Sequence, residues 1–192
     1  PTTNLFQSAL RGFEVDNANW ANGTEFNGTA IETDALIGSD IIALQGATTA
    51  DTQLTGNMTA SNANIQITQN PMGFQQNDVV IIADCEKADM FRISSNPAGG
   101  TITLAHANNV NTTNKLSAAY DDTARIMSFE SVVYFVADTG RVSEQGQAIN
   151  ALYRQTDNLV NAANATFLIE ELIEGVDNMQ ILYGERLASG NL

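Results

Sequence analysis

Hydrophobic and polar positions alternate along most of the chain, a pattern that predicts half-buried β-strands. The alternation is regular in residues 100–107, where Ile102, Leu104 and His106 fall on one face. A continuous apolar run at 79–82, bounded by acidic residues, is typical of a strand buried on both faces. We therefore expect strands at 39–47, 62–70, 77–84, 88–94, 100–107, 124–138 and 148–155.

The beginning of the chain follows a different period. Within residues 4–13 the apolar side chains recur at helical spacing and would share one helix face: Leu5, Phe6, Ala9, Leu10 and Phe13. Residues 16–34 are rich in Asn, Gly and Thr, with Asn-Gly at 22–23 and 27–28, and predict a loop. One helix followed by many strands predicts an α+β fold with an antiparallel sheet, in a single domain spanning 1–192.

The segment 166–186 fits two local structures. Its apolar positions from Leu168 to Val176 suit helical spacing, whereas Gly175 and the alternation from Met179 to Tyr183 favour a turn followed by a strand. The pattern leaves both alternatives open. Gly175 and Gly184 are expected at turns, where positive φ or a close backbone approach requires glycine.

Charge narrows the classes of partner. The 192 residues carry 22 acidic and 8 basic side chains, so the formal net charge is −14, and the basic residues are scattered singly along the chain. Nucleic acid and anionic lipid surfaces both need clustered Lys and Arg, so neither is an expected partner. Hydrophobic residues make up 43% of the chain and charged residues 16%, which predicts a folded rather than a disordered protein.

The inventory of reactive side chains is small. His106 is the only histidine and Cys85 the only cysteine, which excludes a Cys/His zinc site and an intrachain disulfide. A Ser-His-Asp triad would have to use His106, and no nucleophile-elbow, Walker or dinucleotide-binding motif is present. Asp84 and Glu86 flank Cys85, so its thiol lacks the electropositive surroundings that activate cysteine. We expect no cofactor, no metal and no enzymatic activity.

An acidic cluster near the end of the chain allows several interpretations. Glu170, Glu171, Glu174 and Asp177 could in principle bind calcium or act as the two carboxylates of a glycosidase. However, the cluster lacks a calcium-binding loop pattern, and Trp20 is the only tryptophan that could form a sugar platform. The cluster is therefore interpreted as a solvated face.

Three segments, in the same order as in the family, carry a resemblance to PilW-type minor pilins. The sequence Glu-Glu-Leu-Ile-Glu-Gly-Val at 170–176, continued to Tyr-Gly at 183–184, is similar to the family's "ELvEGV…YG" signature. Residues 79–85 with 88–93 resemble its Asp-Cys hairpin, and 116–120, 134–136 and 151–154 follow in its order. The resemblance covers roughly residues 36–184. It marks as motif and interface residues Asp84, Cys85, Glu171, Leu172, Gly175, Val176, Met179, Tyr183 and Gly184.

This resemblance implies a pilin-like fold, with a truncated N-terminal helix packed on an antiparallel sheet. It implies an N-terminal transmembrane helix and a C-terminal strand that this sequence lacks, and residues 4–13 would be the end of that helix. The implied role is structural: a subunit that helps to initiate type IV pilus assembly at the tip, anchored in the inner membrane with a periplasmic domain and later extracellular in the pilus. Its partners would be other minor pilins, the major pilin and a tip adhesin. The sequence departs from the family in that Cys85 has no partner cysteine.

Three other functions stay open at this stage. The nearest is a GspJ-like minor pseudopilin of type II secretion, which shares the general plan. A carbohydrate-binding or adhesin β domain would require a pocket with exposed aromatic side chains. A small secreted hydrolase would require His106 or the carboxylates in a cleft.

Overall fold

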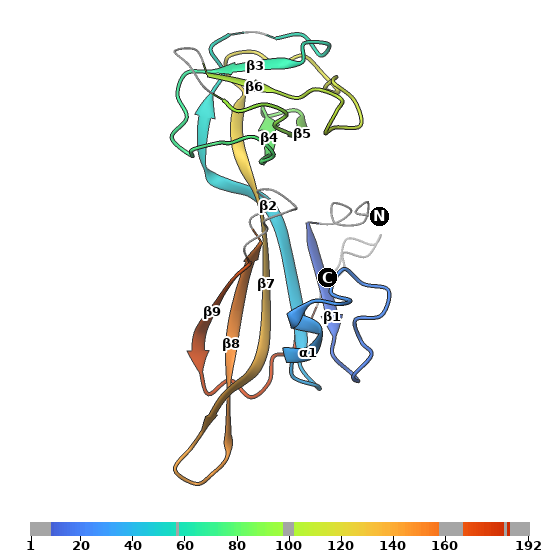
Figure 1. Cartoon of the computed structure of the whole chain (residues 1–192), viewed down its shortest axis with the longest axis vertical. Coiled ribbons are helices and arrows are strands. Elements are labelled where there is room, and N and C mark those ends of the chain that lie inside the picture. Colours follow the sequence, from blue (N-terminus) through green and yellow to red (C-terminus); the bar gives the residue numbers. More distant parts are fainter. Residues whose placement is uncertain (1–8, 57, 98–101, 158–166, 183, 185–192) are drawn as a thin grey trace. The chain divides into compact units, whose positions relative to one another are not determined.

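The computed structural model describes residues 9–56, 58–97, 102–157, 167–182 and 184 (Figure 1). The chain divides into two compact units. Unit 1 comprises residues 1–45, 132–156 and 168–192, and unit 2 comprises 46–131 and 157–167. Two long strands, β2 (Asp40–Gln53) and β7 (Arg125–Val142), contribute residues to both units.

Strands dominate the described residues. Five of them form one continuous path in the order β1-β2-β7-β4-β5, β8 also pairs with β7, β9 pairs with β8, and β3 and β6 form a separate two-stranded sheet. Besides β2 and β7, the strands are β1 (Leu10–Glu14), β3 (Asn64–Ile67), β4 (Val79–Ala83), β5 (Ala88–Arg92), β6 (Ile102–Ala105), β8 (Ala148–Asp157) and β9 (Phe167–Glu174).

The predicted α+β, pilin-like fold is wrong. The helix in the described residues is α1 (Ala30–Asp34), a single short turn, and no helix lies along the sheet. Of the predicted helix 4–13, residues 10–13 belong to β1, and residues 4–8 lie outside the described part of the chain. Leu10 pairs with Leu44 and Phe13 with Ile41. Backbone pairing with β2 therefore overrides a helical spacing that Gly12 already weakened.

Unit 2 has a dense apolar core. The predicted strand at 77–84 is confirmed as β4, in which Val80 and Ile82 have no exposed surface. β4 pairs with β5 on one side and with β7 on the other, both antiparallel. Ile126 from β7 and Leu104 from β6 join the same core, also with no exposed surface. The other face of β4 is less covered, since Val79 is buried but Ile81 and Ala83 are half-buried.

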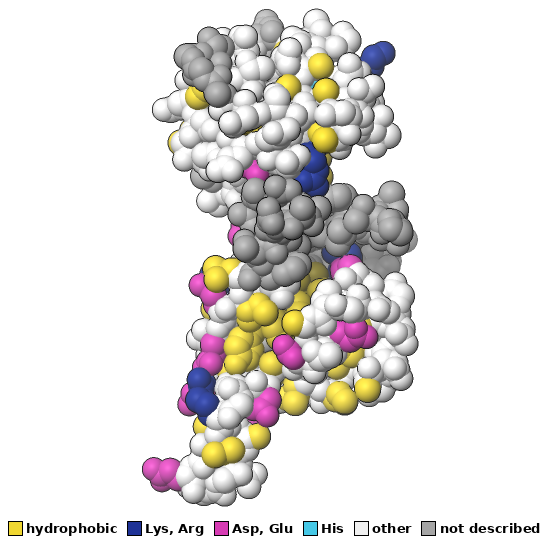
Figure 2. Space-filling view, viewed as in Figure 1, with side chains coloured by type: hydrophobic (Ala, Val, Ile, Leu, Met, Phe, Trp, Pro, Cys, Tyr) yellow, Lys and Arg dark blue, Asp and Glu magenta, His cyan; other side chains and the backbone are white. Residues whose placement is uncertain are grey.

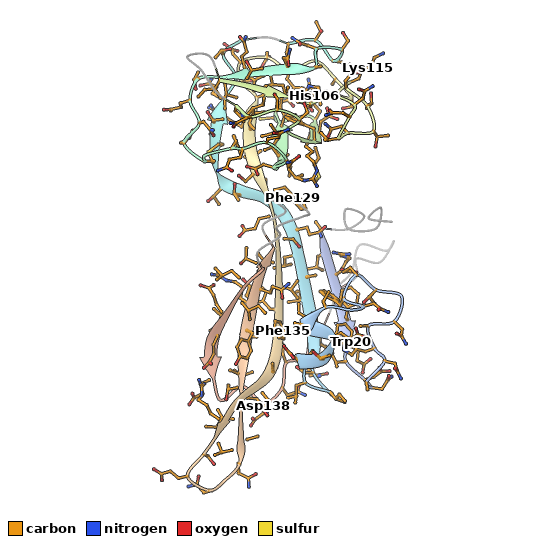
Figure 3. The ribbon with its side chains drawn as sticks, viewed as in Figure 1. Trp20, His106, Lys115, Phe129, Phe135 and Asp138 are labelled. Atoms are coloured by element: carbon orange, nitrogen blue, oxygen red, sulfur yellow. The ribbon has the colours of Figure 1, made fainter. Side chains whose placement is uncertain are left out.

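Unit 1 is built around aromatic side chains. Phe13, Trp20 and Phe26 pack edge-to-face or tilted, with ring centroids 5.0–6.3 Å apart. Phe135 of β7 stacks on Tyr153 of β8 at 5.7 Å, and Figure 3 shows Trp20 and Phe135 in this unit. The predicted loop 16–34 is confirmed apart from α1, and it covers one face of β1 and β2. Among the described residues, no helix has the length and apolar character needed to cross a membrane.

Candidate interaction surface

β9 contains the first part of the sequence motif and forms a margin of the sheet in unit 1. Its one strand neighbour in the described structure is β8. Arg154 of β8 binds Glu170 through both Nε and Nη2, with the Nε–Oε2 contact at 3.0 Å. Tyr153 lies on the opposite face, where its side chain is hydrogen-bonded to Glu171. These two pairs fix which side chains of β9 belong to each face.

β9 exposes large apolar side chains on both of these faces. Leu168 and Leu172 share the face of Glu170, and their exposed fractions are 58% and 42%. Ile169 and Ile173 share the opposite face with Glu171, and their exposed fractions are 43% and 56%. Figure 2 shows hydrophobic side chains over β7 to β9, with acidic groups along the β9 margin. A strand with a covered face would bury one of these two sets.

An arginine from β7 links the acidic residues of this margin. Arg141 Nη2 lies 2.5 Å from Glu171 Oε1 and 2.7 Å from Glu174 Oε2. The hydrogen bond from Arg141 lowers the pKa of Glu171, and the same bond raises the pKa of Arg141. The side-chain Nδ2 of Asn150 lies 3.5 Å from Asp177 Oδ1. The cluster is thus a partly neutralised acidic surface.

The second part of the motif anchors the chain to the start of β2. Gly175 has φ +81, which confirms the predicted need for glycine at this turn. Beyond it, the carbonyl of Met179 accepts a 2.8 Å hydrogen bond from the backbone of Asp40. The Ile181 amide donates to the Asp40 carboxylate at 2.7 Å. Val176 is half-buried, Gly184 is exposed, and Tyr183 lies outside the described residues.

Asp84 and Cys85 lie in unit 2, in the turn between β4 and β5. Asp84 Oδ1 accepts hydrogen bonds from the amides of Glu86 and Lys87, at 2.8 and 2.9 Å. These bonds lower the pKa of Asp84. Cys85 is exposed at the turn as a free thiol. The Asp-Cys motif therefore forms a turn, and it belongs to a different unit from the Glu171–Gly184 motif.

On the outer side of β5 in unit 2, side chains and backbone groups from a later segment of the chain form hydrogen bonds with the strand. Asn111 Oδ1 accepts from the Arg92 amide at 2.7 Å, and its Nδ2 donates to the Arg92 carbonyl at 2.8 Å. Asp89 accepts from the amide and hydroxyl of Ser117 and from the hydroxyl of Tyr120. The side chain of Asn111 thus takes the place of a neighbouring strand at Arg92.

His106 lies in unit 2, where it is buried (Figure 3). It is 1% exposed, and its ring is 4.9 Å from that of Phe91. Burial lowers its pKa, opposed by a hydrogen bond to the Asn62 backbone and by the charge of Asp89. Its Nε2 has no hydrogen-bond partner in the described structure. Within the same residues, no group of three His, Cys, Asp or Glu side chains could hold a metal ion.

A pocket of about 420 Å³ lies beside β3 in unit 2. Its lining combines Asn62, Asn64 and Gln66 with Leu54 and Met58, and contains no aromatic ring among the described residues. The Trp20 indole is half-buried in unit 1 and donates to the Glu32 carbonyl. Neither feature forms the aromatic platform expected of a sugar-binding site.

Sequence reasoning missed the arginines and Asn111. It treated the basic residues as isolated, but the sheet brings Arg141 and Arg154 to the carboxylates of β9. Opposite charges on the predicted strand 148–155 and in the next segment, 166–186, were the available signal for the Arg154 pair. The role of Asn111 has no signal in the sequence, because 19 residues separate it from Arg92.

The chain matches no family model, no curated protein and no solved structure in the three comparisons made with it.

Proposed function

We propose that this chain is a structural subunit of an assembly, of the kind represented by PilW-type minor pilins, and that it acts by binding other subunits. The observation that carries the proposal is β9, in which motif residues Glu171 and Leu172 lie on a margin of the sheet with apolar side chains exposed on both faces. Exposed apolar surface of this kind is a recurrent feature of protein-binding sites. The proposal does not include the helix-on-sheet fold.

The described residues offer little support for a hydrolase. His106 is buried against Phe91, so it has no access to a substrate. Glu170, Glu171 and Glu174 are bound by arginines, and the hydrogen bond from Arg141 lowers the pKa of Glu171. A general acid at neutral pH needs the opposite shift, toward a raised pKa.

The second candidate is a GspJ-like minor pseudopilin of type II secretion. The same motif resemblance supports it, and the same exposed strand would serve assembly there. The two candidates differ in what loss of the protein removes from the cell: surface pili in one case, and secreted proteins in the other.

Deletion of the gene in the source organism tests the proposal. We expect the number of surface pili, counted by electron microscopy, to fall at least about tenfold, and the wild-type gene to restore it. Loss of protein secretion with normal pili would favour the pseudopilin. Normal pili and normal secretion would contradict the assembly role. A His106→Gln strain, in which the protein accumulates at the wild-type level, serves as the control for a hydrolytic role and should keep its pili.

A further inference from the structure

β9 has the properties of a strand that pairs with another chain. An unpaired strand margin presents backbone N–H and C=O groups, and proteins usually block it with proline, lysine, a bulge or a very short strand. β9 has 8 residues, Phe-Leu-Ile-Glu-Glu-Leu-Ile-Glu, and contains neither proline nor lysine. Of the described strands, β8 alone lies beside it.

We propose that β9 binds an extended segment of a partner protein by strand addition, and that this segment alternates apolar residues with Lys or Arg. The inference rests on the proposed assembly function and specifies its binding site. Backbone hydrogen bonds along β9 would supply affinity, and side-chain alternation would supply specificity. On one face, the apolar residues of the partner would contact Ile169 and Ile173. On the other face, its Lys or Arg residues would lie beside Glu170, between Leu168 and Leu172.

The charge of the surface determines the chemistry of the partner. Four carboxylates lie on β9 or just after it: Glu170, Glu171, Glu174 and Asp177. Two guanidinium groups, those of Arg141 and Arg154, pair with the three glutamates. The margin therefore keeps a negative excess, within a chain of net charge −14. A basic partner segment would be attracted over long range, and salt would weaken that attraction.

A second copy of this chain fits less well. Antiparallel pairing of β9 with itself about a two-fold axis can centre on residue 170, 171 or 172. These registers place Glu170 opposite Glu170, Glu171 opposite Glu171, or Glu170 opposite Glu174. Like charges directly opposite each other destabilise a strand pair. Each central register of a β9–β9 dimer is therefore destabilised by like charges. The general repulsion between two chains of charge −14 destabilises the dimer further.

A peptide titration tests the proposal on the full chain. The probe is a peptide of about nine residues, a typical strand length, that alternates Lys with Val or Ile. One control peptide carries Glu in place of Lys, and another has the same composition with its lysines clustered at one end. Binding is followed by fluorescence anisotropy at low and at physiological salt.

Two matched variants locate the binding site. Ile173→Lys and Ile37→Lys add the same charge at residues with similar exposed fractions, 56% and 60%, but Ile37 lies outside β9. We expect the alternating peptide to bind the wild-type protein and the Ile37→Lys variant with similar affinity. Ile173→Lys should weaken binding at least about tenfold. Circular dichroism and thermal unfolding of both variants show whether they are folded.

Several outcomes would overturn the inference. These are no binding of the alternating peptide, equal binding of the clustered or the acidic peptide, an equal loss in both variants, or a dimer of the chain that Ile173→Lys dissociates. Failure here with pili lost on gene deletion would remove the strand-addition site and leave the assembly role. If the peptide binds but gene deletion leaves pili and secretion intact, the strand-addition site would stand and the assembly role would be rejected.

Discussion

The margin strands β5 and β9 of the seven-stranded sheet differ in what lies on their outer sides. In unit 2, β5 has 5 residues, and Asn111 bonds both backbone groups of Arg92 on its outer side. In unit 1, β9 has 8 residues and exposes four large apolar side chains. One margin is closed by the chain itself, and the other presents a surface. On the proposed assembly function, unit 1 would therefore provide the contact with partners, and unit 2 would not.

The largest expected effect comes from an identical substitution in the two units. Ile82→Ala in β4 removes a side chain with no exposed surface and should lower the free energy of unfolding by about 2–5 kcal/mol. Ile173→Ala in β9 removes one that is 56% exposed and should cost well under about 1 kcal/mol. Urea denaturation measures both variants. Similar losses at the two sites would contradict the contrast.

Asn111→Ala should open the margin of β5. It removes the two hydrogen bonds to Arg92 and a third, at 3.1 Å, to the Ala107 carbonyl. The expected cost is about 1–3 kcal/mol, since partly buried backbone groups lose their partner. Asn109→Ala, at an exposed site in the same loop, is the control and should be neutral. If the Arg92 amide keeps its protection from hydrogen exchange, Asn111 does not close this margin.

Gly175→Ala should affect the turn after β9. A left-handed backbone with φ +81 costs an alanine about 1 kcal/mol, and no atom lies within 4 Å of the added methyl group. Gly46→Ala in β2 has equal space without the positive φ and is expected to be neutral or slightly stabilising. Thermal unfolding compares the two. Equal stabilities would show that the conformation of Gly175 matters little.

Acid should weaken unit 2 through His106. Because burial lowers the pKa of His106 below its ordinary value of 6.5, the unfolded chain binds this proton more readily. This contribution to stability is therefore complete above about pH 6.5 and is lost as pH falls through the pKa of the folded protein. His106→Gln leaves no histidine. The free energy of unfolding of this variant should change less with pH than that of the wild type between about pH 7 and 5.5. Parallel pH dependences of the two proteins would exclude the effect.

The smallest effect concerns the pairing on β9. Arg141→Met should raise the pKa of Glu171 toward its ordinary value, because the hydrogen bond that favours the carboxylate is lost. NMR titration of the Glu171 side chain measures the change. Arg154→Met, which leaves the hydrogen bond from Arg141 to Glu171 in place, is the matched control and should keep the pKa of Glu171 lowered.

The strands of the core could be predicted because their burial is periodic. Alternation indicated β3, β5 and β6, and the apolar run indicated β4. β2 continues to Gln53, beyond the predicted end at 47. Its residues after Gly46 show no apolar period, so the sequence did not reveal this part of the strand, which depends on pairing with distant strands. Residues 10–13 were assigned to a helix because spacing alone does not reveal the partner strand at 41–44.

The candidate site was predictable in part. The motif pointed to Glu171 and Leu172, but it grouped them with Asp84 and Cys85, which form a turn in the other unit. The resemblance marked Leu172 as a motif and interface residue but did not indicate how exposed it is. Its 42% exposed fraction depends on what covers the sheet, and this is a property of the tertiary structure.

Amide hydrogen exchange with and without the alternating basic peptide tests the central claim most directly. The account predicts new protection at amides of β9, and no change at β5, where Arg92 is already bonded to Asn111. It also predicts that the protection disappears in Ile173→Lys and persists in Ile37→Lys. Protection on β5, or none on β9 when the peptide is bound, would contradict the claim that unit 1 presents the open strand.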